Sequence, residues 1–327
     1  MQLNSTINWG IIGAGRIART FARDMAFVPH SRILAVASRQ LSDAAKFARE
    51  HNITEAIEGY QALFEHTDID AIYIATPHNF HFEQTKAALQ AGKHVLCEKP
   101  ITISTAQCIE LSGLAKARNC FLMEAMWTWF LPAIRKAKQW VDEGRIGRLL
   151  HVKGDFGYPQ PYDPDARTYN PALAGGALLD MGIYPLALNL LFNPQPYQSL
   201  RVKAHQAPSG VDDEVHWTMD YGDRISTLAT SFRCRLPNYG FIIGDQGYIA
   251  IPDFFRASEA SLYVLDERVD HFRDNRQGSG FEFEIMAASQ AIREGKPESD
   301  IMPLSASLIL QQQMEAILKR IREVPLS

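Results

Sequence analysis

The chain has 327 residues, of which 46% are hydrophobic and 21% are charged, a balance typical of a globular protein with room for two domains. Its 33 basic and 37 acidic residues give a net charge of −4 and are spread along the chain, which argues against a nucleic-acid partner. The first six residues resemble no secretory signal, the longest apolar segment is interrupted by Asp180 and Pro185, and the four cysteines form no Cys-x-x-Cys pair. We therefore expect a cytoplasmic protein with reduced thiols, no membrane contact and no metal site.

Up to about residue 125, short apolar runs alternate with segments of helical period. Strands are predicted over residues 7–13, 32–38, 71–76 and 94–99. A helix is predicted after each strand; we expect Ser42 to cap the second helix, and Ser104 with Gln107 to form a capping box on the fourth. Strands that alternate with helices predict right-handed crossovers and a parallel sheet covered on both faces. The first part of the chain is therefore interpreted as an α/β domain.

The motif Gly13-Ala14-Gly15-Arg16-Ile17-Ala18 closes the first strand and opens the first helix, which is the context of the G-x-G-x-x-G/A dinucleotide fingerprint. Gly13 permits the tight turn, Gly15 lets a pyrophosphate approach the backbone, and Ala18 lets the helix pack closely on the strand. The N–H groups at the start of the helix then attract the phosphates. The alternative is a plain βα turn that uses glycine for geometry alone.

The second strand ends in Ser38-Arg39-Gln40, where an NAD site usually places an acidic residue against the ribose 2′-hydroxyl. A serine hydroxyl and a guanidinium suit a 2′-phosphate instead. NADP is therefore predicted, and NAD is the less favoured cofactor. The alternative is that Arg39 is a solvated loop residue without a ligand.

The third strand is followed by a set of polar residues that would line the path from adenosine to nicotinamide, because ligands of an open α/β sheet bind outside the carboxyl ends of its strands. These residues are Thr76, Pro77, His78, Asn79 and His81. The two histidines are expected to cap the next helix or contact the cofactor, since no carboxylate or cysteine at metal spacing accompanies them.

The fourth strand ends in Cys97-Glu98-Lys99-Pro100, and Glu98 and Lys99 are further candidates for cofactor contact. The Lys99 ammonium is suited to reach the nicotinamide ribose and the reacting substrate oxygen, where it would stabilise an alkoxide. An isolated Glu-Lys-Pro is also typical of a surface turn.

After residue 125 the pattern changes. Helices are predicted over residues 131–143 and 176–191, and a last one carries Leu310, Met314, Ile317 and Ile321 on one stripe. Period-2 segments predict strands over 215–221 and 225–234, and a hairpin over 239–251 that turns at residues 244–247. This part is interpreted as α+β with a largely antiparallel sheet.

Asp180 and Tyr184 lie four residues apart within GGALLDMGIYP, on one face of a helix that is otherwise apolar enough to be buried. A buried carboxylate and a buried phenol each need a partner. Taken alone, Tyr184 is more typical of a core tyrosine than of a catalyst.

Five segments occur in the order seen in the Gfo/Idh/MocA family of glucose–fructose oxidoreductase and inositol dehydrogenase relatives: GAGRIA, ATPHNFH, CEKP, MEAMWTWFLP and GGALLDMGIYP. The resemblance covers nearly the whole chain and is strongest to the branch of dimeric dihydrodiol dehydrogenases and NADP-dependent xylose dehydrogenases. It implies a Rossmann domain over residues 1–125, an α+β domain over residues 126–327 whose open sheet makes a homodimer contact, and a cis Lys99–Pro100 bond.

By match to the family motifs, Lys99 would hydrogen-bond the reacting oxygen, Tyr184 would be the general acid/base, and Asp180 would orient the substrate or these side chains. An ammonium beside a phenol favours the phenolate, so the two residues together can do what neither does well alone.

Aromatic residues are the candidates for the substrate side. The resemblance implies that Trp127 approaches the nicotinamide and substrate. Relatives in this family often carry arginine at position 129. This chain has Trp129 instead, and the loss of that charge favours a less polar substrate. A candidate wall of an aromatic pocket is formed by Phe156, Phe254, Phe255 and Phe281, although aromatic residues of a sheet domain are more often core.

Together these features predict an NADP-dependent oxidoreductase that transfers hydride between nicotinamide and a vicinal diol or cyclic sugar, of the trans-dihydrodiol or aldose dehydrogenase type. One rival is an NADPH-dependent keto-sugar reductase that uses the same residues in reverse. The other is a non-catalytic NADP-binding sensor on the same fold. Retention of both Lys99 and Tyr184 speaks against the sensor, because a binder needs neither proton transfer nor oxyanion support.

Overall fold

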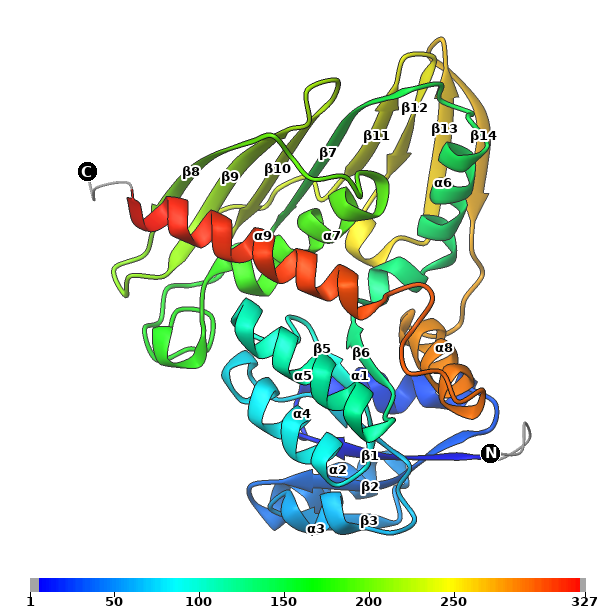
Figure 1. Cartoon of the computed structure of the whole chain (residues 1–327), viewed down its shortest axis with the longest axis vertical. Helices are drawn as coiled ribbons and strands as arrows, with labels where there is room; N and C mark the ends of the chain where they lie inside the picture. The colour runs from blue at the N-terminus through cyan, green and yellow to red at the C-terminus, as the bar shows by residue number, and fades with distance from the viewer. Residues whose placement is uncertain (1–5, 324–327) are drawn as a thin grey trace. The chain divides into compact units, whose positions relative to one another are not determined.

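The computed structural model describes residues 6–323, which divide into two compact units (Figure 1). Unit 1 comprises the chain up to Trp127 together with Gln277–Leu308, and unit 2 comprises Thr128–Arg276 together with the chain from Ile309 onward. The chain therefore returns to unit 1 after Arg276, a crossing that the pattern of predicted elements does not signal.

Sheet A of unit 1 contains six parallel strands in the order β3-β2-β1-β4-β5-β6 (Figure 1). The strands are β1 (Ile7–Ile12), β2 (Ser31–Ser38), β3 (Glu55–Glu58), β4 (Ala71–Ile74), β5 (His94–Glu98) and β6 (Leu122–Ala125). This is the doubly wound order in which the direction of winding reverses between β1 and β4, where dinucleotides bind. The predicted parallel α/β sheet is confirmed.

The helices of unit 1 are α1 (Arg16–Asp24), α2 (Leu41–His51), α3 (Gln61–Glu65), α4 (His81–Gln90), α5 (Thr105–Arg118) and α8 (Phe281–Arg293), with 3₁₀ turns η1 (Met25–Phe27) and η2 (His78–Phe80). The predicted cap of α5 is confirmed, since Gln107 N donates to Ser104 Oγ at 3.3 Å. The predicted cap of α2 is wrong, because the helix already begins at Leu41 and Ser42 lies inside its first turn.

The core of unit 1 is closed by α8, a helix encoded far from the rest of the unit. Trp9 is fully buried and donates from Nε1 to Ser289 Oγ of α8 at 3.2 Å. Phe21 of α1 stacks on Tyr73 of β4 with ring centroids 3.9 Å apart. Residues far apart in the sequence therefore meet in one core.

Sheet B of unit 2 contains eight strands in the order β14-β13-β12-β11-β7-β10-β9-β8, in which β7 and β10 are parallel and the other neighbours are antiparallel. The strands are β7 (Leu149–Gly157), β8 (Ser199–Gln206), β9 (Asp212–Asp220), β10 (Ile225–Ser231), β11 (Gly240–Gly244), β12 (Gly247–Ile251), β13 (Glu259–Val264) and β14 (Glu267–Arg273). The predicted largely antiparallel sheet and the hairpin turning at residues 244–247 are confirmed.

The remaining helical elements are η3 (Trp127–Phe130), α6 (Pro132–Asp142), η4 (Pro171–Leu173), a π-helical turn η5 (Leu178–Gly182), α7 (Ile183–Phe192), η6 (Phe254–Arg256) and α9 (Leu304–Glu323). The helix predicted over residues 176–191 thus forms in two pieces, since a π turn precedes the α-helix.

Among the described residues, the helical segment Pro171–Phe192 has the length and apolar composition of a membrane span. This resemblance is weak, because 83% of its most apolar window is buried inside the structure, as in a core helix.

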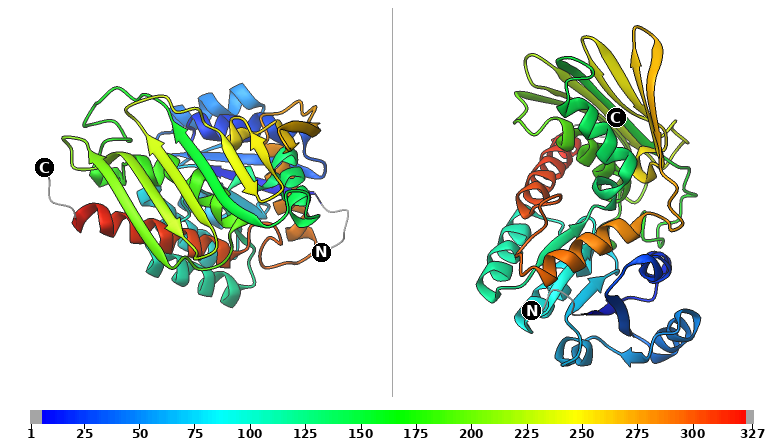
Figure 2. Two further views of the ribbon diagram at one scale, coloured as in Figure 1. Left: turned by 90° about the horizontal axis from the view of Figure 1, so that it is seen from above. Right: turned by 90° about the vertical axis from the view of Figure 1, so that its right-hand side faces the viewer.

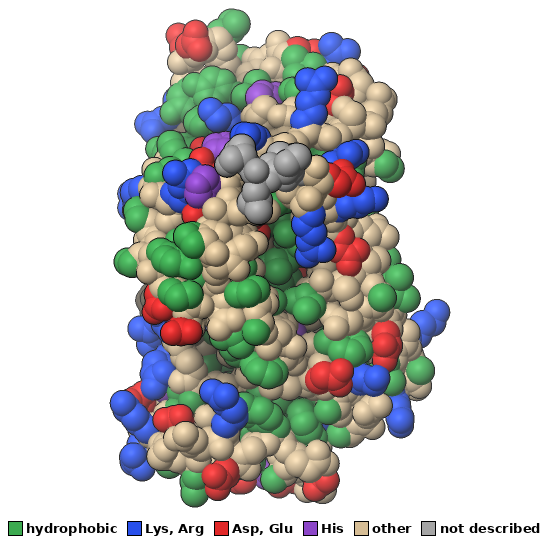
Figure 3. Space-filling view, turned by 90° about the vertical axis from the view of Figure 1, so that its left-hand side faces the viewer, with side chains coloured by type: hydrophobic (Ala, Val, Ile, Leu, Met, Phe, Trp, Pro, Cys, Tyr) green, Lys and Arg blue, Asp and Glu red, His purple; other side chains and the backbone are tan. Residues whose placement is uncertain are grey.

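The two faces of sheet B differ. Helix α7 packs against β7 and β10, and α6 packs against β12, β13 and β14. Side chains alternate between this covered face and the opposite one. Figure 2, left, looks onto sheet B, with its strands side by side in the plane of the view. Aromatic rings lie on the opposite face: Tyr248 stacks on Tyr263, and Phe241 is tilted against Tyr248. Figure 3 shows another side of the molecule, where basic and acidic side chains are interspersed.

Candidate active site

The glycine motif lies where β1 ends and α1 begins. Gly13 has a φ of +98°, and a Cβ there would lie 2.8 Å from the carbonyl oxygen of Ala75, so the turn requires glycine. Gly15 has an ordinary φ of −81°, and a Cβ there would meet no described atom within 4 Å. Neither the backbone nor internal packing explains Gly15, whereas close approach of a ligand does.

The start of α1 also fits an anion. No side chain caps this end of the helix, and its first turn contains no acidic residue. The N–H groups of a first helical turn have no intrahelical partners and favour negative charge. The residues that would hold the pyrophosphate of a dinucleotide are those of the predicted motif: Gly13, Ala14, Gly15, Arg16 and Ile17.

Arg19 supports this turn, although the sequence pattern does not single it out. Its Nη1 donates to the carbonyl oxygen of Ala14 at 2.7 Å, and its Nε donates to Glu50 Oε2 of α2 at 3.1 Å. The guanidinium therefore joins the glycine turn to the neighbouring helix. A basic residue on the first turn of the helix is the one signal that the sequence offers for it.

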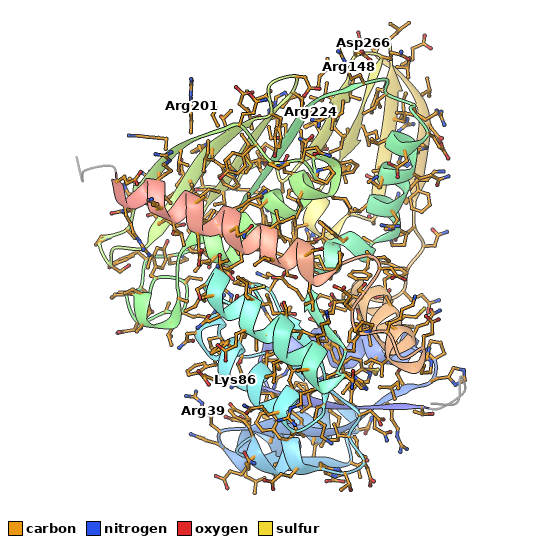
Figure 4. The ribbon with its side chains drawn as sticks, viewed as in Figure 1. Arg39, Lys86, Arg148, Arg201, Arg224 and Asp266 are labelled. Atoms are coloured by element: carbon orange, nitrogen blue, oxygen red, sulfur yellow. The ribbon has the colours of Figure 1, made fainter. Side chains whose placement is uncertain are left out.

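The end of β2 carries the residues that were expected to select the cofactor. Ser38 ends the strand, and the exposed Arg39 side chain projects outward from the ribbon (Figure 4). Burial raises the pKa of Tyr60, and the Arg39 guanidinium partly offsets that effect. The strand β3, which is not predicted from the sequence, pairs Glu58 with Ser38 and so brings an exposed carboxylate to the same sheet edge.

The loop after β4 is held by side-chain hydrogen bonds. Thr76 Oγ1 donates to Gln84 Oε1 of α4 at 2.5 Å. His81 is the first residue of α4 and is fully buried; its Nε2 lies 2.8 Å from the Thr76 carbonyl oxygen and its Nδ1 lies 2.7 Å from that of Pro100. The His81 ring therefore joins the loop after β4 to the turn after β5.

The other residues predicted to line the cofactor path also lie in the loop after β4. Pro77 precedes the 3₁₀ turn that contains His78 and Asn79. His78 is 6% exposed, and its ring centroid lies 5.7 Å from that of His81. The structure thus gathers the predicted loop residues at the carboxyl end of β4, beside the strand β1 that carries the glycine motif.

Lys99 follows directly on β5, and the preceding carboxylate holds its backbone. Glu98 is 7% exposed; its Oε1 accepts from Tyr73 Oη at 2.5 Å and its Oε2 accepts from Lys99 N at 3.3 Å. Burial, and then the charge of Glu98, raise the pKa of Tyr73 well above its usual value, so its phenol remains a donor. The Lys99–Pro100 bond is cis, as the family resemblance implies.

The two tryptophans of MEAMWTWFLP have different surroundings. Trp127 packs on Phe281 of α8, with ring centroids 4.8 Å apart. Trp129 is 5% exposed and donates from Nε1 to the carbonyl oxygen of Ala187 in α7 at 3.0 Å. Trp129 thus has a packing role within unit 2, which accounts for an aromatic residue at this position without reference to a substrate.

In unit 2, Asp180 has a partner that the sequence pattern does not predict. Nη2 of Arg167 donates to its two carboxylate oxygens at 3.1 and 3.2 Å. The Arg167 and Asp180 side chains are 38% and 19% exposed, so the pair is open to water. Arg167 lies in the loop between β7 and η5, 13 residues before Asp180, and no local spacing signals the contact.

Tyr184 lies in α7 among the aromatic residues expected on the substrate side. Its ring centroid is 5.3 Å from that of Phe156 and 6.0 Å from that of Phe255, and these two phenylalanines stack at 4.1 Å. Phe254 is fully buried, so its proposed place in a pocket wall is wrong. Phe281 belongs to unit 1, where it packs on Trp127.

The segment that carries Asp180 and Tyr184 is anchored by a buried carboxyl. Asp212 Oδ2 accepts from Leu178 N at 2.6 Å, and burial raises the pKa of Asp212 to about 6. Gly176 has a φ of +120°, and a Cβ there would lie 2.6 Å from Asp212 Oδ1. The second glycine of GGALLDMGIYP is therefore explained by close approach of this carboxyl.

Comparison with known proteins now identifies the class. Residues 7–126 match the model of the Gfo/Idh/MocA oxidoreductase family with an NAD-binding Rossmann fold, and residues 134–250 match the C-terminal domain of the same family. The chain is 32% identical to trans-1,2-dihydrobenzene-1,2-diol dehydrogenase of Xenopus laevis over 323 residues, which cover 96% of this chain and 97% of the relative. The human protein of the same name is 31% identical over 327 residues, with the same two coverages.

Solved structures give the same picture. Aldose–aldose oxidoreductase from Caulobacter crescentus superimposes with a TM-score of 0.89 at 23% identity, over 98% of this chain and 100% of that one. A 3-ketoreductase from Actinomadura kijaniata in complex with NADP has a TM-score of 0.85 at 27% identity, over 96% of this chain and 98% of that one. The chain belongs to the Gfo/Idh/MocA oxidoreductase family, and the predicted class, a dehydrogenase with an NAD(P)-binding Rossmann fold, is confirmed.

Proposed function

We propose that the protein is an NADP-dependent dehydrogenase that transfers hydride between nicotinamide and a vicinal diol or cyclic sugar. Support for the substrate class comes from the dihydrodiol dehydrogenases that share about a third of its residues over nearly the whole chain. The observation that carries the catalytic proposal is that Lys99 follows β5 directly and Tyr184 lies on α7, each at the position that matches the family motif.

The residues of the chain would divide the reaction as follows. The nicotinamide, when bound, supplies the hydride donor or acceptor. Tyr184 takes the proton of the substrate hydroxyl during oxidation and returns it during reduction. Lys99 donates a hydrogen bond to the same oxygen and stabilises the negative charge that develops there. Asp180, oriented by Arg167, accepts from a second substrate hydroxyl.

The surroundings of Tyr184 suit this role. Phe156 and Phe255 pack around its ring and leave it 8% exposed. An apolar environment with little water strengthens the hydrogen bonds made by a phenol or phenolate. Aromatic side chains around the phenol also favour a substrate with an apolar ring face, such as a cyclic sugar or dihydrodiol.

The test is a panel of aldoses and trans-dihydrodiols assayed for NADP reduction by the wild type and by Tyr184→Phe. The variant is expected to lose about 10²- to 10⁴-fold in kcat, because a positioned acid/base group contributes that much. The dissociation constant for NADPH, followed by its fluorescence, should stay within about twofold, because the substitution removes an acid/base group and no cofactor contact. Turnover equal to that of the wild type would refute the role of Tyr184.

Tyr221→Phe is the matched control. Tyr221 is also a buried tyrosine of unit 2, and its hydroxyl accepts from Asn189 Nδ2 at 2.7 Å. Loss of that hydroxyl should lower stability and leave the kcat of the folded enzyme unchanged. If both variants lose activity equally, the effect of Tyr184→Phe is one of packing rather than of proton transfer.

A second candidate is the reduction of a keto sugar with NADPH, which uses the same residues in the opposite direction. The NADP-bound 3-ketoreductase that superimposes on 96% of this chain favours including it. Keto sugars are assayed with NADPH beside the aldose and diol panel. Faster turnover of one panel than of the other separates the keto-sugar reductase from the diol or sugar dehydrogenase. A non-catalytic NADP-binding sensor predicts that the wild type binds NADPH and turns over no member of either panel.

A further inference from the structure

The turn that carries Lys99 is fixed at three successive residues. Lys99 N donates to Glu98 Oε2 at 3.3 Å, and the carbonyl oxygen of Pro100 lies 2.7 Å from His81 Nδ1. Ile101 N donates to Glu124 Oε1 at 2.9 Å. The groups that hold the turn come from β5, α4 and β6, so three elements of unit 1 determine where the Lys99 backbone lies.

Glu124 is the unexpected member of this set. It lies on β6 opposite Cys97 of β5, is 1% exposed, and uses Oε1 to hold Ile101. Its Oε2 is also buried, and the Ser307 hydroxyl of α9 lies beside the carboxyl. A carboxyl inside a parallel sheet is costly to bury, so its retention there calls for a reason beyond packing.

Polar and titratable groups from several elements lie around Glu124. Lys99 and Glu98 lie at the end of β5, Cys97 lies on β5, Cys108 on α5 and Ser307 on α9. Burial raises the pKa of Glu124 to about 7, against the lowering effects of the Ile101 N–H, the Ser307 hydroxyl and the Lys99 ammonium. The carboxyl therefore changes charge close to neutral pH.

We propose that Glu124 is a positioning residue for Lys99, holding the Lys99–Pro100–Ile101 turn through the Ile101 N–H. The inference rests on the proposed function, because it assigns Glu124 to the turn that presents the catalytic ammonium. The ionised carboxylate holds the N–H more tightly than the neutral acid does, since charge-assisted hydrogen bonds are roughly twice as strong. Lys99 is therefore best positioned above the pH at which Glu124 loses its proton.

Glu124→Gln tests the proposal, because glutamine keeps an oxygen for Ile101 N and cannot ionise. Its kcat at pH 6 should lie within about threefold of the wild type, and at pH 8 it should be about tenfold lower, as expected when a charged acceptor becomes neutral. The KM and the dissociation constant for NADPH should change little, because positioning of Lys99 acts on the transition state. In wild type, kcat should rise through an ionisation near pH 7 that the variant lacks.

A second readout does not depend on turnover. The backbone amide of Ile101, followed by hydrogen exchange in peptides spanning residues 98–104, should exchange faster in Glu124→Ala and be largely protected again in Glu124→Gln. The stability difference between wild type and Glu124→Gln should also vary with pH. The folded pKa of Glu124 lies above its ordinary value of 4.5, so wild type should lose stability relative to the variant from about pH 4.5 to about 7 and be constant above that.

Glu284→Gln is the matched control. Glu284 is a fully buried carboxyl of α8 in the same unit, and neither oxygen has a hydrogen-bond partner among residues 6–323. Burial raises the pKa of Glu284 well above its usual value, so glutamine mimics its neutral form. This control should leave the exchange of Ile101 and the ionisation in kcat unchanged.

The outcomes separate the two proposals. An unchanged pH profile in Glu124→Gln, or unchanged exchange of Ile101 in Glu124→Ala, overturns the role of Glu124. If the wild type turns over no member of the substrate panels, the proposed function fails, and the exchange measurement alone then supports or overturns the claim that Glu124 holds the turn.

Discussion

At the scale of single residues, the cofactor preference depends on two opposite charges at one sheet edge. Arg39 follows β2 and suits the 2′-phosphate of NADP. Glu58 ends β3 and pairs with Ser38, where a carboxylate would suit the free 2′-hydroxyl of NAD. Both side chains are exposed, and each favours a different cofactor.

Arg39→Ala is expected to weaken NADPH binding about 10- to 100-fold, as for loss of a hydrogen bond to a charged group, and to leave NADH binding nearly unchanged. Glu58→Gln serves as the control and should leave NADPH binding intact or improve it slightly. Fluorescence titration of both variants with both nucleotides measures this. Tighter binding of NADH than of NADPH by the wild type would contradict the NADP proposal.

The candidate site is predictable from the sequence where its signal is local. The glycine motif, Lys99 and Tyr184 lie in short patterns tied to strand ends and helix starts. Arg167 and Glu124 are different, because their roles come from contacts made by folding. Glu124 stands inside a family motif, yet it accepts from Ile101, 23 residues earlier, through the pairing of β5 with β6.

At the scale of secondary structure, the predicted elements include the four-residue β4, while β7, β8, β13, β14 and the 13-residue α8 are missed. The strand β3 and the helix α3 have four and five residues, too few for a reliable period, and no residue of β3 is buried. The π turn η5 is invisible to a pattern of apolar residues, because one extra residue in a turn leaves the segment apolar. The caps show a similar limit: Ser42 and Ser104 both precede helical patterns, and only Ser104 caps a helix.

Ser104→Ala should destabilise the protein by about 1 kcal/mol, because α5 loses the acceptor for its Gln107 N–H. For a chain of this size, the melting temperature should fall by roughly 2 °C. Ser42→Ala is the control and should leave it unchanged, because Ser42 makes no capping bond. Equal melting temperatures for both variants would show that the Ser104 cap contributes nothing.

At the scale of the whole molecule, the face of sheet B opposite α6 and α7 supports a proposal of self-association. Its aromatic rings form a continuous row from Tyr239 and Phe241, 5.6 Å apart, to Tyr248 and Tyr263, 4.7 Å apart. Aromatic residues are enriched at protein interfaces. Next to this row, a cavity of about 520 Å³ is lined in part by Lys153, Arg201 and Lys203.

We expect a homodimer formed through this face, and Phe241→Asp should convert it to a monomer, because a buried unpaired carboxylate opposes association. Sedimentation equilibrium would report a mass near 36.7 kDa for the variant and twice that for the wild type. Leu265→Asp, at an 89% exposed turn position between β13 and β14, is the control that should remain dimeric. A monomeric wild type at micromolar concentration would contradict the expectation.

The late return of the chain to unit 1 has a consequence for how the protein is made. The helix α8 supplies Ser289 to the buried Trp9, and Asp24 of α1 accepts from the backbone N–H of Ser279 and of Phe281. When only the first 127 residues have emerged from the ribosome, the nucleotide-binding unit therefore lacks α8, and the part of its apolar core that α8 covers is exposed. The unit is complete only after about 180 further residues have been synthesised. A fragment that ends after β6 would therefore expose aromatic surface to which chaperones bind.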